Sequence, residues 1–301
     1  MSMRIWERLK NGLAALGLAA LAAGSAAPAY AKAAKPAMWQ VSDKDTSIYL
    51  FGTVHLLPPG TQWRTPKLDK AANEAGTLVV ETIIDEKNPR LFAAELARLS
   101  IRPGLPPIVS RVAPEKQAAL RAVIAKAGIP EAALNNMETW AAAFALLQLQ
   151  FKELGVSGTD GVELVLRNAF TAAGKRVEQL ETNSQQLGFF DALPEAAQRQ
   201  LLEGAIESPA AAKKQFDAML AAWMSGDVNA IGRTFNAEFK SSPELKDILL
   251  KRRNANWAYW LHSRMGQPGT VFVAVGAGHL AGEDSVVEML KKRGLRVKRV
   301  Q

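Results

Sequence analysis

Short apolar runs, each about as long as one buried strand, lie near both ends of this 301-residue chain and once in its middle. The run TLVVETIID at 77–85 is too continuously apolar for a strand at the edge of a sheet. The run FVAV at 272–275 is similar, and Gly276, Gly278 and His279 follow it at once. Strands spread along a chain with helical segments between them predict an α/β fold.

The first elements predict a crossover unit. Residues 36–57 contain two β-rich runs around the polar turn SDKDT, which is typical of a hairpin. A helix is expected between its cap Thr65 and its stop Gly76, and the strand at 77–85 follows. Strand, helix and strand within so short a stretch indicate a crossover.

The rest of the chain alternates helical stretches with further strands. The expected elements are helices over 88–168 and 191–264, strands over 172–182 and 269–278, a helix over 283–294 and a last strand over 295–301. No long linker or repeat interrupts them. We therefore expect one α/β domain with helical insertions over 32–301.

The N-terminus predicts a signal peptide over 1–31. Basic residues precede the apolar run 13–23, and Ala29-Tyr30-Ala31 puts small residues at the positions that signal peptidase reads. An uncleaved anchor is the alternative, but the run is shorter than the roughly 20 residues that span a bilayer. We expect cleavage before Lys32, no stable membrane span afterwards, and a periplasmic or secreted protein.

Composition narrows the possible chemistry. The net charge is +8, but the basic residues are spread out and only 251–256 and 291–300 are dense, so we expect no nucleic-acid partner. The chain contains 0 cysteines, which excludes disulfides, thiolate ligands and a cysteine nucleophile.

Two of the three histidines end a predicted strand and follow a glycine at the same spacing. These are Gly52-Thr-Val-His55 and Gly276-Ala-Gly-His279. The third, His262, lies in a helical segment, and we expect it to be structural. Each strand-end histidine could also simply bond a nearby carbonyl, but the repeated pattern favours a shared site.

Two further strands end in a carboxylate, Glu81 after LVV and Glu181 after VEQL. Ligands of open α/β sheets collect at the carboxyl ends of the strands. An ionised, unpaired carboxylate in an apolar strand costs several kcal/mol, so Glu81 needs a cation, an arginine or a raised pKa. Glu81 could instead pair with Arg253, and Glu181 could cap the helix that follows it.

Two imidazoles with one or two carboxylates match the ligand sets of Zn²⁺, Mn²⁺ and similar ions. We expect His55, Glu81 and His279 to hold a divalent ion, Mn, Co or Zn. A metal-activated water would be the nucleophile, and Glu181 would act as its base or as an orienting group.

Other catalytic patterns fit less well. GAGHLAG at 276–282 loosely matches a dinucleotide fingerprint, but only one strand follows it and no acidic residue is placed for a ribose. The nucleophile elbow, the zinc-protease helix motif and the phosphate loop are absent from the sequence. A Ser–His–acid triad stays open, because its members need not be close in sequence.

Several segments together resemble one family across nearly all of the expected mature chain. They are YLFGTVHLLP, LVVET, AAGKRVEQLETNSQQLGFFDALP, RNANW and FVAVGAGHLAGEDSVVEMLKKRGLRVKRV. The set resembles the TraB/GumN family, which includes the Tiki proteins. The resemblance implies a central mixed β-sheet flanked by helices, related to erythromycin-esterase-like and ChaN-like proteins.

The resemblance also implies a metal-dependent site built from two Gly-x-x-His motifs and a glutamate, which here are His55, His279 and Glu81. Glu181 and Arg253 fall on further family positions, and we expect both to be catalytic together with Glu81. The chain departs from the family where Gly-x-Asp is common. Here Glu163 takes that place with Asp160 just before it, so the role of both acids stays open.

The sequence thus predicts an exported metal-dependent hydrolase that acts on a peptide or protein substrate. One alternative is a non-catalytic periplasmic protein that sequesters a peptide or glycan in the same cleft. Another is a metal-independent esterase, which a chelator would leave active.

Overall fold

A computed structural model describes residues 34–84 and 88–301 of the chain, so the predicted signal peptide over 1–31 lies outside the described residues. In the described part, six strands form one sheet in the order β4-β3-β5-β2-β1-β6. They are β1 (Met38–Ser42), β2 (Thr46–Thr53), β3 (Thr77–Val80), β4 (Arg176–Gln179), β5 (Gly269–Gly276) and β6 (Val297–Arg299).

The sheet is mixed. Strands β2, β5, β3 and β4 run parallel to one another, whereas β1 is antiparallel to both β2 and β6. The predicted hairpin, helix, crossover and closing strand are all present, and the α/β prediction with a central mixed sheet is confirmed. The strand expected over 77–85 is shorter, because it leaves the sheet at Val80.

Helices occupy the long stretches of sequence between the strands. They are α2 (Pro66–Glu74), α3 (Pro89–Ser100), α4 (Gln117–Ala127), α5 (Glu131–Asn135), α6 (Thr139–Glu153), α7 (Val162–Ala172), α8 (Asn183–Asp191), α9 (Glu195–Gly204), α10 (Pro209–Ser225), α11 (Val228–Glu238), α12 (Pro243–Lys246), α13 (Arg252–Arg264) and α14 (Val286–Lys292). The two long helical stretches predicted from periodicity are therefore confirmed.

Each face of the sheet packs against helices, because alternate side chains of a strand point to opposite faces. Val271, Val273 and Val275 of β5 belong to the core formed with α13 and α14. Phe272 and Ala274 belong to the larger core, which also contains side chains of α2, α6, α7 and α8. Burial on both faces explains why this run is continuously apolar.

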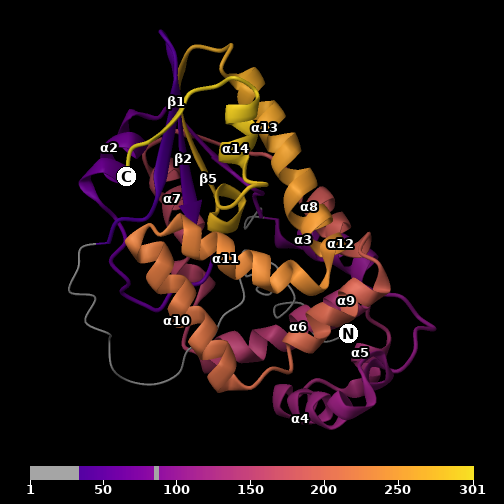
Figure 1. The fold of residues 1–301 in the computed structure, drawn as a ribbon. Coiled ribbons are helices and arrows are strands. Elements are labelled where there is room, and N and C mark those ends of the chain that lie inside the picture. The colour runs from indigo at the N-terminus through magenta and orange to yellow at the C-terminus, as the bar shows by residue number, and fades with distance from the viewer. Residues whose placement is uncertain (1–33, 85–87) are drawn as a thin grey trace.

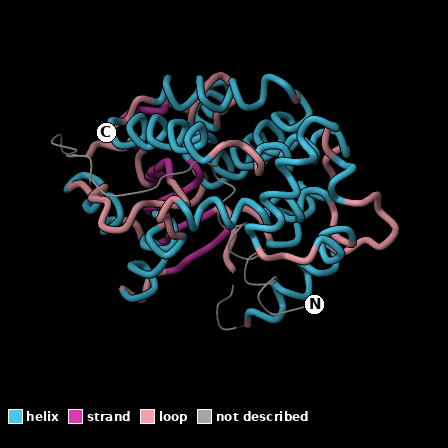
Figure 2. Tube along the Cα trace, turned by 90° about the horizontal axis from the view of Figure 1, so that it is seen from below, coloured by secondary structure: helices cyan, strands magenta, loops and turns pink. Residues whose placement is uncertain are grey.

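Strands from the first and the last part of the described chain pair in the sheet, where indigo β1 and β2 lie beside yellow β5 (Figure 1). Helices α4, α5, α6 and α9 lie away from the strands, and Figure 2 likewise shows the strands to one side of a larger helical part. Among the described residues, no helix combines the length and apolarity needed to cross a membrane.

Candidate functional site

The parallel strands β2, β3, β4 and β5 end at the same edge of the sheet, and the predicted site residues lie just beyond those ends. His55 follows β2, Glu81 follows β3 directly, and Glu181 follows β4. His279 lies in the short 3₁₀ turn Ala277–Leu280 after β5. The topology therefore brings residues far apart in the sequence to one place.

Arg253 of α13 joins two of these strand ends. Its Nη2 donates to Glu81 Oε2 at 2.7 Å and to Glu181 Oε2 at 2.9 Å, and its Nε donates to Glu181 Oε1 at 3.0 Å. All three side chains are buried. The Glu81–Arg253 pairing that the sequence left open is thus present, and one guanidinium serves two buried carboxylates.

Glu81 is held ionised by its surroundings. Its Oε1 accepts the Gly276 N–H at 2.8 Å, and Gln186 Nε2 donates to its Oε2 at 3.2 Å. Burial alone would raise the pKa of Glu81, but the Arg253 guanidinium lowers it to about 2. Glu81 therefore carries its negative charge at neutral pH.

Glu181 does not cap the next helix. Thr182 is the N-cap of α8, in a capping box with Gln185, so the alternative of a Glu181 cap is wrong. Glu181 instead accepts the Trp257 Nε1–H at 3.0 Å besides its bonds from Arg253. Burial raises the pKa of Glu181, and the nearby Glu81 carboxylate adds to this effect, whereas Arg253 opposes it.

The bonds of Asn254 assign the tautomer of His279. Asn254 Nδ2 donates to the Asp284 carbonyl at 2.7 Å, so its Oδ1 is the atom 2.6 Å from His279 Nδ1. His279 Nδ1 therefore carries the proton, and Nε2 accepts from Arg253 Nη1 at 3.3 Å. Burial lowers the pKa of His279 to about 3, so the ring is neutral.

His55 contacts an acid whose role the sequence left open, Glu163 in the first turn of α7. The His55 Nδ1 atom lies against Glu163 Oε2, and Thr53 Oγ1 donates to Glu163 Oε1 at 2.8 Å. Burial would lower the pKa of His55, but the Glu163 carboxylate raises it above its usual value. Gly161 lets the start of α7 pack close to the His55 backbone, because a Cβ at position 161 would overlap the His55 carbonyl oxygen.

His55, Glu81 and Glu163 offer ligand atoms that all lie within 4.8 Å of one another. The sequence predicted His279 in place of Glu163. His279 Nε2 lies 3.8 Å from Glu81 Oε1, but Arg253 occupies the direction of its lone pair. The structure thus groups the predicted ligands His55 and Glu81 with Glu163, and it leaves His279 beside this group rather than in it.

A cavity of about 700 Å³ opens onto this cluster, which is within the range of roughly 300–1,000 Å³ usual for ligand pockets. His55, Glu81, Glu163 and Arg253 line it. Glu181 is not among the lining residues, and its bonds place it behind Arg253. That position fits a group that orients Arg253 rather than one that touches a ligand.

The glycines of the GAGH segment serve close packing. A Cβ on Gly278 would overlap the ring of Phe235 from α11, and the Gly276 N–H bonds Glu81. The segment thus presents His279 at a strand end.

Sequence reasoning missed the site contacts of Gln186 and Trp257. Both lie in segments that carry the family resemblance, RNANW and the one that contains NSQQ, but their helical positions gave no indication of these contacts. Glu163 was visible only as an acid soon after a glycine.

Comparison with known proteins supports one family. The model of the family described as TraB/PrgY/gumN matches residues 37–299. The chain is 25% identical over 243 residues to the uncharacterized protein YbaP of Escherichia coli (strain K12), covering 81% of this chain and 87% of that protein. It is 23% identical over 282 residues to an uncharacterized protein of Treponema pallidum (strain Nichols), covering 85% and 80%. No solved structure matches the chain significantly.

Proposed function

This chain belongs to the TraB/PrgY/gumN family, and from that premise we propose that it is a metal-dependent hydrolase of peptide bonds. The observation that carries the proposal is the group His55, Glu81 and Glu163 on the wall of a large cavity. The proposed cofactor is a divalent ion, Mn, Co or Zn.

The donor set fits such an ion. One imidazole and two carboxylates are ligands that these metals accept. Two atoms bound to one ion at 2.0–2.2 Å can be at most about 4.4 Å apart, which is close to the observed limit of 4.8 Å.

The charges of the cluster point the same way. Glu81 and Glu181 share Arg253, Glu163 lies against His55, and His279 is neutral. A divalent cation would balance the remaining negative charge. The pKa of His55 is raised, so a proton on His55 offsets part of that negative charge when no cation is bound.

In this proposal His55, Glu81 and Glu163 hold the ion. When bound, the ion supplies Lewis acidity, which polarises a carbonyl group and makes water a better nucleophile near neutral pH. Arg253 lines the cavity in a fixed position and stabilises negative charge that develops on the substrate oxygen. Glu181 keeps the guanidinium in place, and Asn254 keeps His279 in the tautomer that accepts from it.

The lining of the cavity supports a peptide substrate. Asn183, Gln186 and Ser157 offer amide and hydroxyl groups near the cluster, and such groups can bond the N–H and C=O of an extended chain. We also propose that the mature protein begins at Lys32 and acts in the periplasm or outside the cell.

The test is metal analysis and peptide cleavage with the mature protein. We expect stoichiometric metal, and cleavage of an unstructured peptide library with Mn²⁺, Co²⁺ or Zn²⁺ that a chelator abolishes. His55→Ala should lose both, whereas His262→Ala, an exposed histidine of α13, should keep both. Cleavage that survives chelation would show a metal-independent hydrolase, and no cleavage with any metal would overturn the proposal.

A further inference from the structure

The cavity has two chemically different parts. The cluster of His55, Glu81, Glu163 and Arg253 forms its floor at the sheet edge. Opposite the strand ends, the helical insertions contribute a wall of apolar side chains: Phe92 of α3, Phe151 of α6, Val156 in the turn after α6, and Leu187 and Phe190 of α8. A ligand that reaches the floor therefore lies against this apolar wall.

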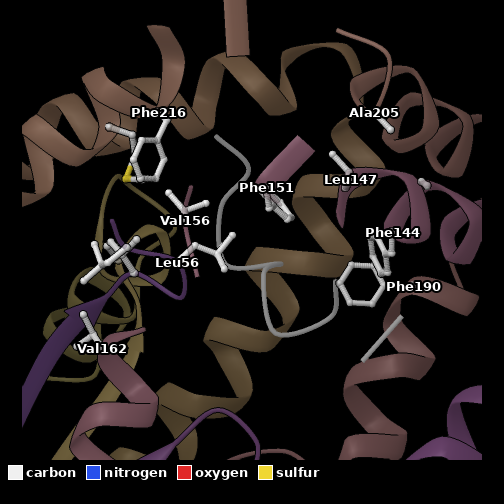
Figure 3. Packing of buried hydrophobic residues seen from close by; sticks show 14 of the residues in the cluster. Leu56, Phe144, Leu147, Phe151, Val156, Val162, Phe190, Ala205 and Phe216 are labelled. Carbon is white, nitrogen blue, oxygen red and sulfur yellow. The ribbon is translucent and has the colours of Figure 1, made fainter. Parts of the chain in front are cut away.

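The wall is fixed by packing behind it. The Phe190 ring meets Phe144 edge to face at a centroid distance of 5.0 Å and stacks on Trp140 at 6.1 Å. Figure 3 shows Phe190 beside Phe144, with Phe151, Val156 and Leu56 in the same core. Because these side chains are already ordered, a substrate that packs against the wall loses little binding free energy to ordering them.

The charged side chains that line the cavity also affect which substrate side chains can bind beside the apolar wall. Among the described lining residues the acids are Glu81 and Glu163, both on the floor. Away from the floor the charged lining residues are basic: Lys152, Arg167 and Lys126, the last of which pairs with Glu153. A substrate side chain that lies along the wall therefore meets apolar surface and positive charge, which disfavours lysine or arginine at that position.

We propose that this wall is a specificity subsite, which selects peptides that place a large apolar side chain, such as leucine or phenylalanine, next to the bond to be cleaved. The inference rests on the proposed hydrolase function and names its substrate class. Val156 is the residue that sets the depth of the subsite, because it lies in the turn between α6 and the floor.

The test uses a series of short peptides that differ at one position: leucine, phenylalanine, alanine, glutamate or lysine. Binding to the chelated mature protein is measured by calorimetry, and cleavage is measured separately with metal. We expect the leucine and phenylalanine peptides to bind at least about tenfold more tightly than the alanine peptide, and the lysine peptide to bind most weakly.

Val156→Phe should fill the subsite and remove the preference for the large side chains while the alanine peptide still binds. Leu91→Phe is the matched control, because Leu91 lies on α3 with 71% of its surface exposed. Val156→Ala, which should favour still larger side chains, serves if Val156→Phe does not fold.

The outcomes separate the two proposals. Graded binding that Val156→Phe abolishes, without cleavage under any metal, would overturn the hydrolase and leave a binding subsite. Cleavage and binding that are equal for all five peptides would keep the hydrolase and overturn the subsite.

Discussion

At the candidate site, His279 shows how burial keeps an imidazole neutral. Its folded pKa is about 3, whereas an unfolded histidine has a pKa of about 6.5. Between these values the unfolded chain binds one proton more than the folded protein at this residue. The stability that neutral His279 contributes is therefore complete above about pH 6.5 and is lost as the pH falls toward 3.

We predict that His279→Gln makes the free energy of unfolding less dependent on pH between about pH 6 and 4. One proton corresponds to a slope of about 1.4 kcal/mol per pH unit, so the wild-type slope should drop by up to that amount. Urea unfolding of the chelated protein at several pH values measures it. His262→Gln should keep the wild-type slope, and equal slopes in all three proteins would contradict the assignment.

We expect that lysine cannot replace arginine at position 253. Arg253→Lys keeps the charge but cannot bond Glu81 and Glu181 at once through a planar fork. We predict a folded protein whose melting temperature is lower by several degrees and whose peptide cleavage falls by about a hundredfold or more. Arg252→Lys, on the exposed neighbour, should change neither. A fully active Arg253→Lys protein would remove Arg253 from the mechanism.

Replacing each of the three site glutamates by glutamine should affect metal binding and cleavage differently. Glu81→Gln and Glu163→Gln should lose metal and cleavage together, because both acids belong to the proposed ligand group. Glu181→Gln should keep most of the metal yet lose about a hundredfold in cleavage, because it loosens Arg253. Metal content and cleavage are measured beside the exposed control Glu115→Gln. Loss of metal from Glu181→Gln would show that Glu181 is a ligand.

At the level of the elements, periodicity and turn residues predicted all six strands and the helices α2 and α14 one by one, but the helices of 88–168 and 191–264 only as two long stretches. The order of strands could not be predicted. The apolar runs of β2, β3 and β5 are equally suited to be neighbours, and the place of β5 between the other two depends on packing of the whole sheet.

The same limit applied to the site. Position at the end of a predicted strand identified four candidate site residues: His55, Glu81, Glu181 and His279. Glu163 comes from the start of a helix whose position only the folded chain defines.

The turn after β5 depends on close contact with α11. We predict that Gly278→Ala destabilises the fold by roughly 1–3 kcal/mol, because the added methyl overlaps the Phe235 ring. Adding Phe235→Leu should recover part of the loss. Thermal unfolding measures both, and Gly204→Ala on α9, where a Cβ meets nothing within 4 Å, should cost little. An unchanged melting temperature for Gly278→Ala would show that the turn and α11 move apart freely.

For the whole molecule, the segment just after the predicted cleavage site is bonded to the end of α10. The Lys35 N–H donates to the Met224 carbonyl at 2.8 Å. We predict that protein recovered from the cell envelope begins at Lys32, as mass spectrometry of the intact chain would show. An intact Met1 on membrane-bound material would instead indicate an anchor.

The sheet pairs early strands with late ones, and this sets when the site can form. Strand β2 cannot pair with β5, nor β1 with β6, until residues 269–301 have emerged. Contacts between such distant segments form slowly, because a long loop must be closed first. His55 and Glu81 are thus made early but wait for Arg253 and His279. A chain that has not yet reached residue 269 holds His55, Glu81 and Glu163 without the strand β5 that brings them together, so any activity would start only after residues 269–301 have emerged.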